Sequence, residues 1–267
     1  MCSVRLDAMP GARWLARSCR SALRSRSMAF SRLMASAFAH RGLWHPCGPP
    51  ENSMAAFEAA ADAGVGIELD VQLSKDGVPV VFHDPMLDRM TEASGAVWNL
   101  NEEDLTALRL SGSRECIPTL SGVARRLPAG TPVLVELKPS PGEAADYLRA
   151  VELALFGTRI DSAVMSFTPA LNLAARAVMP GRRRGVLVMP KRGITGEDAV
   201  NAMAEAIALE ADYLAVRHEQ IAVFAQGPEP RLPLYAWTVD GEDALVAARD
   251  AASGIIFEHL EPALVTG

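Results

Sequence analysis

The chain has 267 residues, of which 49% are hydrophobic and 22% charged, with a net charge of −6. This composition is typical of a globular enzyme, and the length suits one α/β barrel or two small domains. No apolar run approaches the roughly 20 residues that span a bilayer. We therefore expect no stable membrane insertion.

The charge is distributed unevenly along the chain. Residues 1–35 form a basic N-terminal extension, with seven arginines against one acid, whereas residues 36–267 carry 19 basic against 31 acidic side chains. Binding to nucleic acid needs a basic footprint, which this acidic body lacks. We expect no nucleic-acid partner.

The extension has two interpretations. Its Arg, Ser, Ala and Met residues fit an organelle transit peptide, but they also fit translation from an upstream start, with Met28 or Met34 as the true beginning. We favour the second, because the predicted domain needs nothing before about Ala35. We expect this segment to be poorly ordered or a stray helix, and we take residues 36–267 as the folded domain.

The cysteine pattern bears on cellular location. The four cysteines show neither metal-ligand spacing nor a disulfide framework: Cys2, Cys19, Cys47 and Cys116. They indicate reduced thiols in a cytoplasmic protein.

From residue 36 onward, β-type apolar runs alternate with Ala-rich helical segments. Asn52 is the expected N-cap of the first helix and Gly64 its stop. Eight such units in about 230 residues predict a closed (β/α)₈ TIM barrel. The predicted strands are Ser36–His40, Gly66–Val71, Val133–Leu137, Ala163–Phe167, Arg184–Val188, Tyr213–Val216, Leu234–Val239 and Gly254–Phe257, with helices near 52–63, 119–127, 141–156, 169–178, 196–209, 218–226, 241–251 and 260–265.

One apolar run, residues 78–83, follows the second strand too closely for a parallel crossover. Asp76-Gly77 is a strong signal for a two-residue hairpin turn. That turn places Asp70 directly opposite His83, on one face and about 5 Å apart at Cβ. The hairpin therefore returns His83 to the barrel mouth.

Residues 85–118 form a long insertion before the next barrel helix. It contains Asp88-Arg89-Met90-Thr91 and an acidic, helix-like piece at Asn101–Leu108. We expect a small lid at the mouth that shapes substrate access.

Polar side chains cluster at the ends of predicted strands, where barrel enzymes carry their functional groups. Glu68 and Asp70 share one face of a strand, and Glu136 and Lys138 share a face of the next. Three converging carboxylates would repel one another unless a cation lay among them, and an all-oxygen ligand set selects Mg²⁺ or Ca²⁺ over zinc.

The same strand ends offer groups for phosphate and for proton transfer. Arg41 can bind phosphate with two hydrogen bonds, and Lys138 acts as a point charge; both could also pair with the carboxylates. Two imidazoles on opposite sides of a phosphate can serve as general base and general acid. Of the five histidines, His45, His218 and His259 are expected to be structural or exposed.

The order and spacing of His40-Arg41-Gly42, Pro50-Glu51-Asn52, Glu68-x-Asp70, His83-Asp84 and Glu136-x-Lys138 resemble the glycerophosphodiester phosphodiesterase family. The resemblance continues through Ser166-Phe167 and Trp237-Thr238-Val239, and so covers roughly residues 36–262.

The resemblance implies metal-dependent hydrolysis of glycerophosphodiesters to sn-glycerol 3-phosphate and an alcohol. It makes Glu68, Asp70 and Glu136 the metal ligands, with Glu51 as a further acid near the site. It pairs His40 with His83 as acid and base, leaving open which does which. It places Trp237 in the wall of the glycerol pocket, and Ser166-Phe167 reads as pocket wall rather than nucleophile.

The chain departs from the family pattern in two places. Members commonly carry Thr-Asp or Thr-Asn after the last strand's glycine-aliphatic run, where this chain has Phe257-Glu258-His259. The loop between Gly42 and Pro50 is also distinctive, with Trp44, His45 and Cys47. These differences leave the identity of the leaving alcohol open.

Two alternatives remain. One is a related phospholipase D-type barrel enzyme acting on lysolipid or sphingolipid headgroups, which would be expected to show aromatic loops around the mouth; only 6% of residues are aromatic. The other is a non-catalytic phosphoester-binding barrel, which would be expected to lose at least one of the histidines or carboxylates. A small-molecule glycerophosphodiester is the favoured partner.

Overall fold

A computed structural model describes residues 37–227 and 232–267. Eight parallel strands form a closed ring, because β1 pairs with both β2 and β9, and this confirms the predicted barrel. The strands are β1 (Ala37–His40), β2 (Gly66–Leu73), β4 (Pro132–Leu137), β5 (Asp161–Ser166), β6 (Arg183–Leu187), β7 (Tyr213–Arg217), β8 (Leu234–Asp240) and β9 (Gly254–Glu258). The prediction for residues 1–35 lies outside the described residues and stays a prediction.

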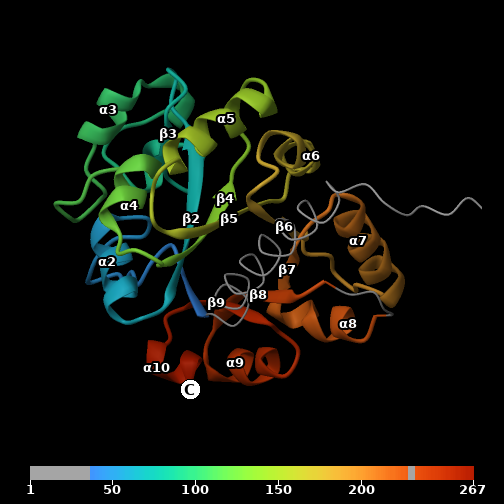
Figure 1. Ribbon diagram of the computed structural model, residues 1–267. Helices are drawn as coiled ribbons and strands as arrows, with labels where there is room; N and C mark the ends of the chain where they lie inside the picture. The colour runs from blue at the N-terminus through green and yellow to red at the C-terminus, as the bar shows by residue number, and fades with distance from the viewer. Residues whose placement is uncertain (1–36, 228–231) are drawn as a thin grey trace, which may run out of the picture.

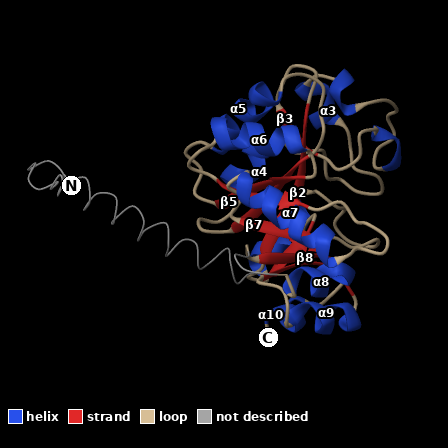
Figure 2. Ribbon diagram, turned by 90° about the vertical axis from the view of Figure 1, so that its right-hand side faces the viewer, coloured by secondary structure: helices blue, strands red, loops and turns tan. Residues whose placement is uncertain are grey.

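Helices surround the ring of strands (Figures 1 and 2). They are α2 (Met54–Asp62), α4 (Leu120–Arg126), α5 (Ala144–Leu155), α6 (Pro169–Val178), α7 (Gly196–Ala208), α8 (Ile221–Ala225), preceded by the 3₁₀ turn η3 (His218–Gln220), α9 (Glu242–Arg249) and α10 (Pro262–Thr266). Within residues 37–227 and 232–267, no helix combines the length and apolar character that crossing a bilayer needs.

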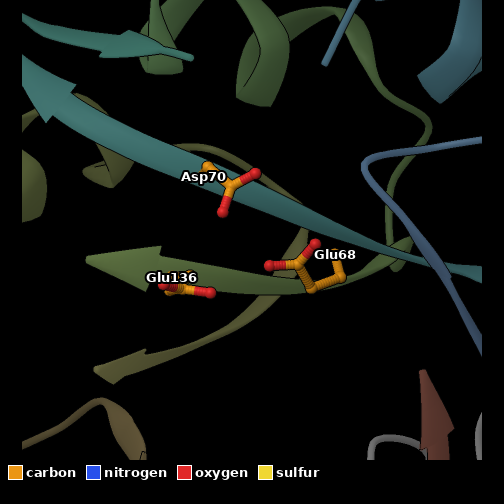
Figure 3. A group of neighbouring side chains, drawn as sticks. All are labelled: Glu68, Asp70 and Glu136. Carbon is orange, nitrogen blue, oxygen red and sulfur yellow. The ribbon is translucent and has the colours of Figure 1, made fainter. Parts of the chain in front are cut away.

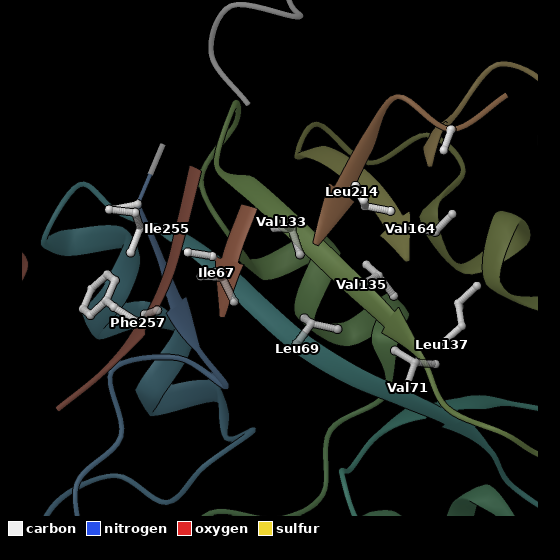
Figure 4. Packing of buried hydrophobic residues seen from close by; sticks show 14 of the residues in the cluster. Ile67, Leu69, Val71, Val133, Val135, Leu137, Val164, Leu214, Ile255 and Phe257 are labelled. Atoms are coloured by element: carbon white, nitrogen blue, oxygen red, sulfur yellow. The ribbon is translucent and has the colours of Figure 1, made fainter. Parts of the chain in front are cut away.

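Alternate residues of the strands build two separate cores. Outward-facing aliphatic side chains pack beneath the helices, among them Ile67, Leu69 and Val71 of β2 (Figure 4). The barrel interior holds aromatic rings instead, with Tyr213 and Tyr235 only 4.6 Å apart at their centroids. The period of two along each strand explains why functional side chains at the strand ends can point inward while their neighbours point to the helices.

Glycines in the barrel wall make room for these rings. A Cβ on Gly185 would lie 2.2 Å from the ring of Tyr213, and one on Gly254 would lie 2.5 Å from the ring of Tyr235. A larger residue at either position would therefore displace an interior aromatic side chain. Below the mouth, side chains fill the interior of the barrel, as in other barrels of this kind.

The hairpin forms, but the predicted register is wrong by one residue. Val71 pairs with Val81 in the antiparallel ladder between β2 and β3 (Pro79–Val81). Phe82, not His83, donates its backbone N–H to the carbonyl of Asp70 (3.0 Å). His83 still reaches the mouth, because it follows the end of β3 and lines the central cavity.

The turn explains the difference. The loop has three residues instead of two, closed by the N–H of Ser74 donating to the carbonyl of Val78 (3.0 Å). Its last residue, Gly77, has a φ of +81°. A turn followed by a left-handed glycine is the usual three-residue hairpin, and an Asp-Gly pair fits it as well as a two-residue turn.

The insertion 85–118 builds a small core of its own beside the hairpin. Two 3₁₀ turns, η1 (Leu87–Arg89) and η2 (Val97–Asn99), and the helix α3 (Glu102–Ala107) pack against Val80 and Phe82 of the hairpin. None of its described residues is among those that line the central cavity. Arg89 of the insertion reaches the site, where it donates to Glu51 and Asp84, and the predicted role of the insertion in substrate access stays a prediction.

Candidate active site

Three carboxylates meet at the carboxyl ends of β2 and β4, as predicted. Asp70 and Glu136 are direct neighbours in the parallel ladder, and Glu68 lies two residues before Asp70 on the same strand face. Each offers an oxygen within 4.8 Å of the others, and all three side chains are buried. Figure 3 shows them pointing toward one another.

Burial and mutual repulsion make this cluster electrostatically strained. Burial, together with the charges of Asp70 and Glu136, raises the pKa of Glu68 well above its usual value. Burial and the charge of Asp70 raise the pKa of Glu136 to about 7. The carboxyls of Glu68 and Glu136 therefore resist ionisation, and a cation bound among them would favour their charged forms.

Asp70 is different because two cations flank it. Lys138 Nζ lies 2.9 Å from its Oδ1, and Arg41 Nε lies 3.3 Å from its Oδ2. Burial alone would raise the pKa of Asp70, but these charges outweigh it and hold the pKa below its ordinary value. Lys138 also donates to Glu136 (2.5 Å), so the predicted pairing of cations with carboxylates is confirmed.

Asn52 holds Asp70 from a second side. Its Nδ2 donates to Asp70 Oδ2 (2.8 Å), and its Oδ1 accepts from the backbone N–H of Asp70 (3.3 Å). The predicted N-cap role of Asn52 is wrong, since Ser53 caps α2 by accepting from the N–H of Ala56. Asn52 instead adopts a φ of +55°, which asparagine tolerates better than most residues, and turns its amide into the site.

The donor set fits a hard divalent cation. Every ligand atom offered is a carboxylate oxygen, and Glu68 Oε1 is buried with no hydrogen-bond partner among the described residues. A buried carboxylate oxygen without a partner is costly, and a cation among the three groups would satisfy it. The cluster could therefore hold a metal ion.

His40 lies at the end of β1, between two glutamates. Its Nε2 lies 3.9 Å from Glu68 Oε2, and its Nδ1 lies 3.4 Å from Glu258 Oε2 at the end of β9. The pairing of β1 with both β2 and β9 explains this position. The imidazole thus touches the carboxylate cluster on one side and the last strand on the other.

His83 is held by its sequence neighbour. Asp84 Oδ1 lies 2.7 Å from His83 Nδ1, and Arg89 in turn donates to both oxygens of Asp84 (2.5 and 3.0 Å). The hydrogen bond from Arg89 lowers the pKa of Asp84 to about 2, with His83 contributing. Burial lowers the pKa of His83. Burial therefore favours the neutral imidazole, and with Nδ1 facing Asp84, Nε2 is the nitrogen left to accept a proton.

Glu51 anchors Arg41 and does not join the carboxylate cluster. Arg41 Nη1 donates to Glu51 Oε1 (2.9 Å), and the backbone N–H of Arg41 donates to Glu68 Oε2 (3.2 Å). Arg89 donates two further hydrogen bonds to Glu51. Glu51 is close to the site, as predicted, but it acts on the guanidinium of Arg41.

These groups surround one central cavity of about 140 Å³. Trp237 and Phe167 form part of its wall, with their rings edge to face at 5.3 Å, and Trp237 Nε1 is buried without a hydrogen-bond partner among the described residues. Ser166 is buried beneath, where its hydroxyl donates to the carbonyl of Leu137 (2.7 Å), so it is no nucleophile. The predicted site residues that line this cavity are His40, Arg41, Glu68, His83, Glu136, Lys138 and Trp237.

The sequence motifs and this geometry agree with a match to one protein family. Residues 40–261 match the model of the glycerophosphoryl diester phosphodiesterase family. The chain belongs to this family. As in the family's named relatives, its reaction class is that of a phosphoric diester hydrolase.

Individual members of the family match over most of their length. YhdW of Bacillus subtilis, whose assigned name is that of a glycerophosphodiester phosphodiesterase, is 31% identical over 77% of this chain and 86% of its own length. The glycerophosphodiester phosphodiesterase of Caldanaerobacter subterraneus is 30% identical over 84% of this chain and 93% of its own. An Oleispira antarctica phosphodiesterase, solved in complex with the product sn-glycerol-3-phosphate, superposes with a TM-score of 0.70 at 25% identity, covering 86% of this chain and 94% of that one.

The sequence predicts no role in the site for four residues that contact it. Their signals were present but ambiguous: Asp84 follows a histidine directly, Arg89 lies in a charged run of the insertion, Asn52 follows Glu51, and Glu258 ends the last strand. The three histidines expected to be structural or exposed lie in two different surroundings. His218 bonds the carbonyl of Thr238 (2.8 Å), whereas His45 and His259 line a second, larger cavity beside the site.

Proposed function

We propose that this glycerophosphodiester phosphodiesterase hydrolyses glycerophosphodiesters to sn-glycerol 3-phosphate and an alcohol, in a metal-dependent reaction with a two-histidine acid/base pair. The observation that supports it best is that His40 and His83 line the same small cavity as Glu68 and Glu136. Two imidazoles beside a buried carboxylate cluster are the groups that metal-assisted hydrolysis with proton transfer would need.

We assign the metal to Glu68, Asp70 and Glu136, and Mg²⁺ or Ca²⁺ suits their oxygens best. When bound, the cation would lower the pKa of the attacking hydroxyl and offset charge on the phosphate. Asn52 and Lys138 hold Asp70 in place from two sides. That arrangement orients the carboxylate before any ligand arrives.

The two imidazoles take different roles in this proposal. His83 has its Nδ1 engaged by Asp84, and burial lowers its pKa and so favours the neutral ring, so its Nε2 suits the acceptance of a proton from the attacking hydroxyl. His40 then donates a proton to the oxygen of the leaving alcohol. Proton donation is needed there because an alkoxide is a poor leaving group.

Arg41 and Lys138 supply positive charge to the phosphate oxygens. Burial works against the charged form of each, but the surrounding carboxylates raise both pKa values and keep them protonated. Trp237 offers an apolar wall and an unsatisfied indole N–H to the glycerol half of the substrate. The phosphate and the glycerol are thus held by different parts of one cavity.

We place this activity in the cytoplasm, acting on a dissolved substrate. The low aromatic content supports a substrate other than a bilayer lipid. Cys47 and Cys116, the two cysteines within the described residues, carry free thiols. Sedimentation with anionic and neutral vesicles tests the assignment, because strong vesicle binding would favour the lipid-active alternative.

The decisive experiment follows hydrolysis of glycerophosphocholine with and without EDTA. We expect turnover that EDTA abolishes and Mg²⁺ or Ca²⁺ restores, with sn-glycerol 3-phosphate as the product. A cyclic glycerol phosphate instead would show attack by the substrate's own 2-hydroxyl. No turnover with either metal would contradict the proposed function.

A further inference from the structure

The two places where the sequence departs from the family pattern meet in space. Trp44, from the loop after β1, lies edge to face against the imidazole of His259, from the loop after β9, with ring centroids 4.8 Å apart. His259 has a φ of +54°, an unusual conformation for a residue with a side chain. Residues 42–46 and 257–262 together enclose a cavity of about 520 Å³.

This cavity, which we call the rim cavity, adjoins the catalytic site. One of its walls is Glu258, whose carboxylate lies 3.4 Å from His40 Nδ1. Its first loop begins at Gly42, immediately after Arg41. A group bound here would therefore lie beside Glu258, the carboxylate that faces His40 Nδ1.

The sizes of the two cavities suggest that each cavity holds a different half of the substrate. The central cavity, at about 140 Å³, is smaller than the roughly 300–1,000 Å³ typical of ligand sites. The rim cavity, at about 520 Å³, falls within that range. The central cavity suits the phosphoglycerol half alone, and the rim cavity has room for the second alcohol.

The lining of the rim cavity selects by charge. It contains the carboxylates of Glu258 and Glu261, the indole of Trp44 and two imidazoles, and no lysine or arginine among the described residues that line it. Glu261 is exposed, and its carboxylate forms no ion pair within the part of the chain that the structure describes. An unpaired carboxylate and an indole that line one cavity are a combination that attracts ammonium groups.

We propose that the rim cavity binds the leaving alcohol and prefers one that carries a positive charge, of the choline or ethanolamine type. This inference rests on the proposed function, because it assigns the second half of the same substrate. His40 then lies between the two halves, beside the oxygen that must receive a proton when the ester bond breaks. A neutral headgroup, such as glycerol or inositol, would form no favourable charge interaction with Glu261.

The test compares kcat/KM for glycerophosphocholine with that for glycerophosphoglycerol, whose leaving alcohol is neutral. We expect the cationic substrate to be favoured by about 10-fold or more, the scale of one aromatic and one carboxylate contact. Choline alone should inhibit competitively, and its uncharged isostere 3,3-dimethylbutanol at the same concentration should not.

Variants then show which residues of the rim cavity cause the preference for the cationic substrate. Glu261→Gln and Trp44→Leu should each lower the ratio of the two kcat/KM values about 3- to 10-fold, mainly through KM, and Trp44→Phe should retain most of it. Glu242→Gln, an exposed glutamate at the start of α9 that does not line the rim cavity, is the matched control and should leave the ratio unchanged. A ratio is insensitive to the fraction of a variant that folds.

The outcomes separate the two levels of inference. Equal or better turnover of the neutral substrate, or variants that slow both substrates alike, would overturn the rim-cavity assignment and leave the phosphodiesterase activity standing. Turnover of neither substrate with Mg²⁺ or Ca²⁺ would overturn the proposed function itself.

Discussion

Arg89 donates two hydrogen bonds to Glu51, which lies 38 positions earlier in the chain, at 2.7 and 2.8 Å. The same guanidinium donates two more to Asp84, and these two carboxylates hold Arg41 and His83 respectively. One side chain of the insertion therefore fixes both the proposed phosphate-binding group, Arg41, and the proposed proton acceptor, His83. The guanidinium of Arg89 carries several N–H donors in one plane, so it can form two hydrogen bonds to each of two carboxylates.

Replacing Arg89 with lysine should impair turnover more than stability. An ammonium cannot form the paired hydrogen bonds to both carboxylates, so Arg41 and His83 lose their fixed orientation. We expect kcat to fall about 10- to 100-fold, the usual effect of losing a supporting partner in a site. Steady-state kinetics alongside thermal melting measures both quantities.

Arg126→Lys is the control for Arg89→Lys. Arg126 also forms two hydrogen bonds to one carboxylate, Glu58, but both side chains are exposed on the outer face of the barrel. Exposed pairs contribute little to stability, so kcat and Tm should change little. Equal effects of the two substitutions would contradict a positioning role for Arg89.

Removal of divalent metal should abolish activity and lower thermal stability. A cation that binds only the folded chain stabilises it by about 2.7 kcal/mol at a hundredfold excess over Kd, so Mg²⁺ or Ca²⁺ should raise Tm. Asp70→Asn should remove most of that rise. Full turnover after exhaustive chelation would rule out Glu68, Asp70 and Glu136 as catalytic metal ligands.

The metal-free protein should become less stable as pH rises from about 4.5 to about 7. Burial raises the pKa of Glu136 to about 7 in the folded state, above the usual value of about 4.3 in an unfolded chain. The folded state then binds more protons than the unfolded state over this range, so stability falls with rising pH, by up to about 3 kcal/mol. Melting of EDTA-treated protein across this range measures the slope.

Glu136→Gln supplies the comparison for that slope. The neutral amide cannot titrate, so the metal-free variant should keep its stability near pH 7 and should be at least as stable there as the metal-free parent. Unchanged pH dependence in the variant would show that Glu136 is not the group responsible.

Alanine at His40 or His83 should each cost on the order of 10²–10⁴ in turnover, the usual contribution of a general acid or base. The double variant should lose much less than the product of the two, because residues acting as a unit are not additive. A nitrophenyl ester needs no proton on its leaving group, so it should rescue His40→Ala and not His83→Ala. Rescue of His83→Ala alone would exchange the two roles.

The pH profile of the same reaction should be bell-shaped. Activity should rise with pH as His83 loses its proton, and burial, which lowers the pKa of His83, places that limb below the ordinary histidine range. His83→Ala should remove the low-pH limb. If both substitutions act only on KM, the pair binds phosphate and transfers no proton.

The sequence by itself determined the barrel and the grouping of carboxylates at its mouth. Strand runs alternate with helical segments, and residues two apart on one strand share a face, so the grouping of Glu68, Asp70 and Glu136 follows from spacing. Strands of a parallel barrel present their carboxyl ends at one mouth, which brings His40 to the same place. These features depend on local spacing or on the order of strands and helices, so one amino-acid sequence is enough to predict them.

Only the tertiary structure decided the contacts that support this chemistry. The hairpin register depended on whether the Asp76-Gly77 turn has two or three residues, and the same residues permit both. The double bridge of Arg89 and the meeting of Trp44 with His259 join segments far apart in the chain. Such contacts depend on side-chain direction and loop conformation, which follow no period along the sequence and become fixed only when the loops pack around the mouth.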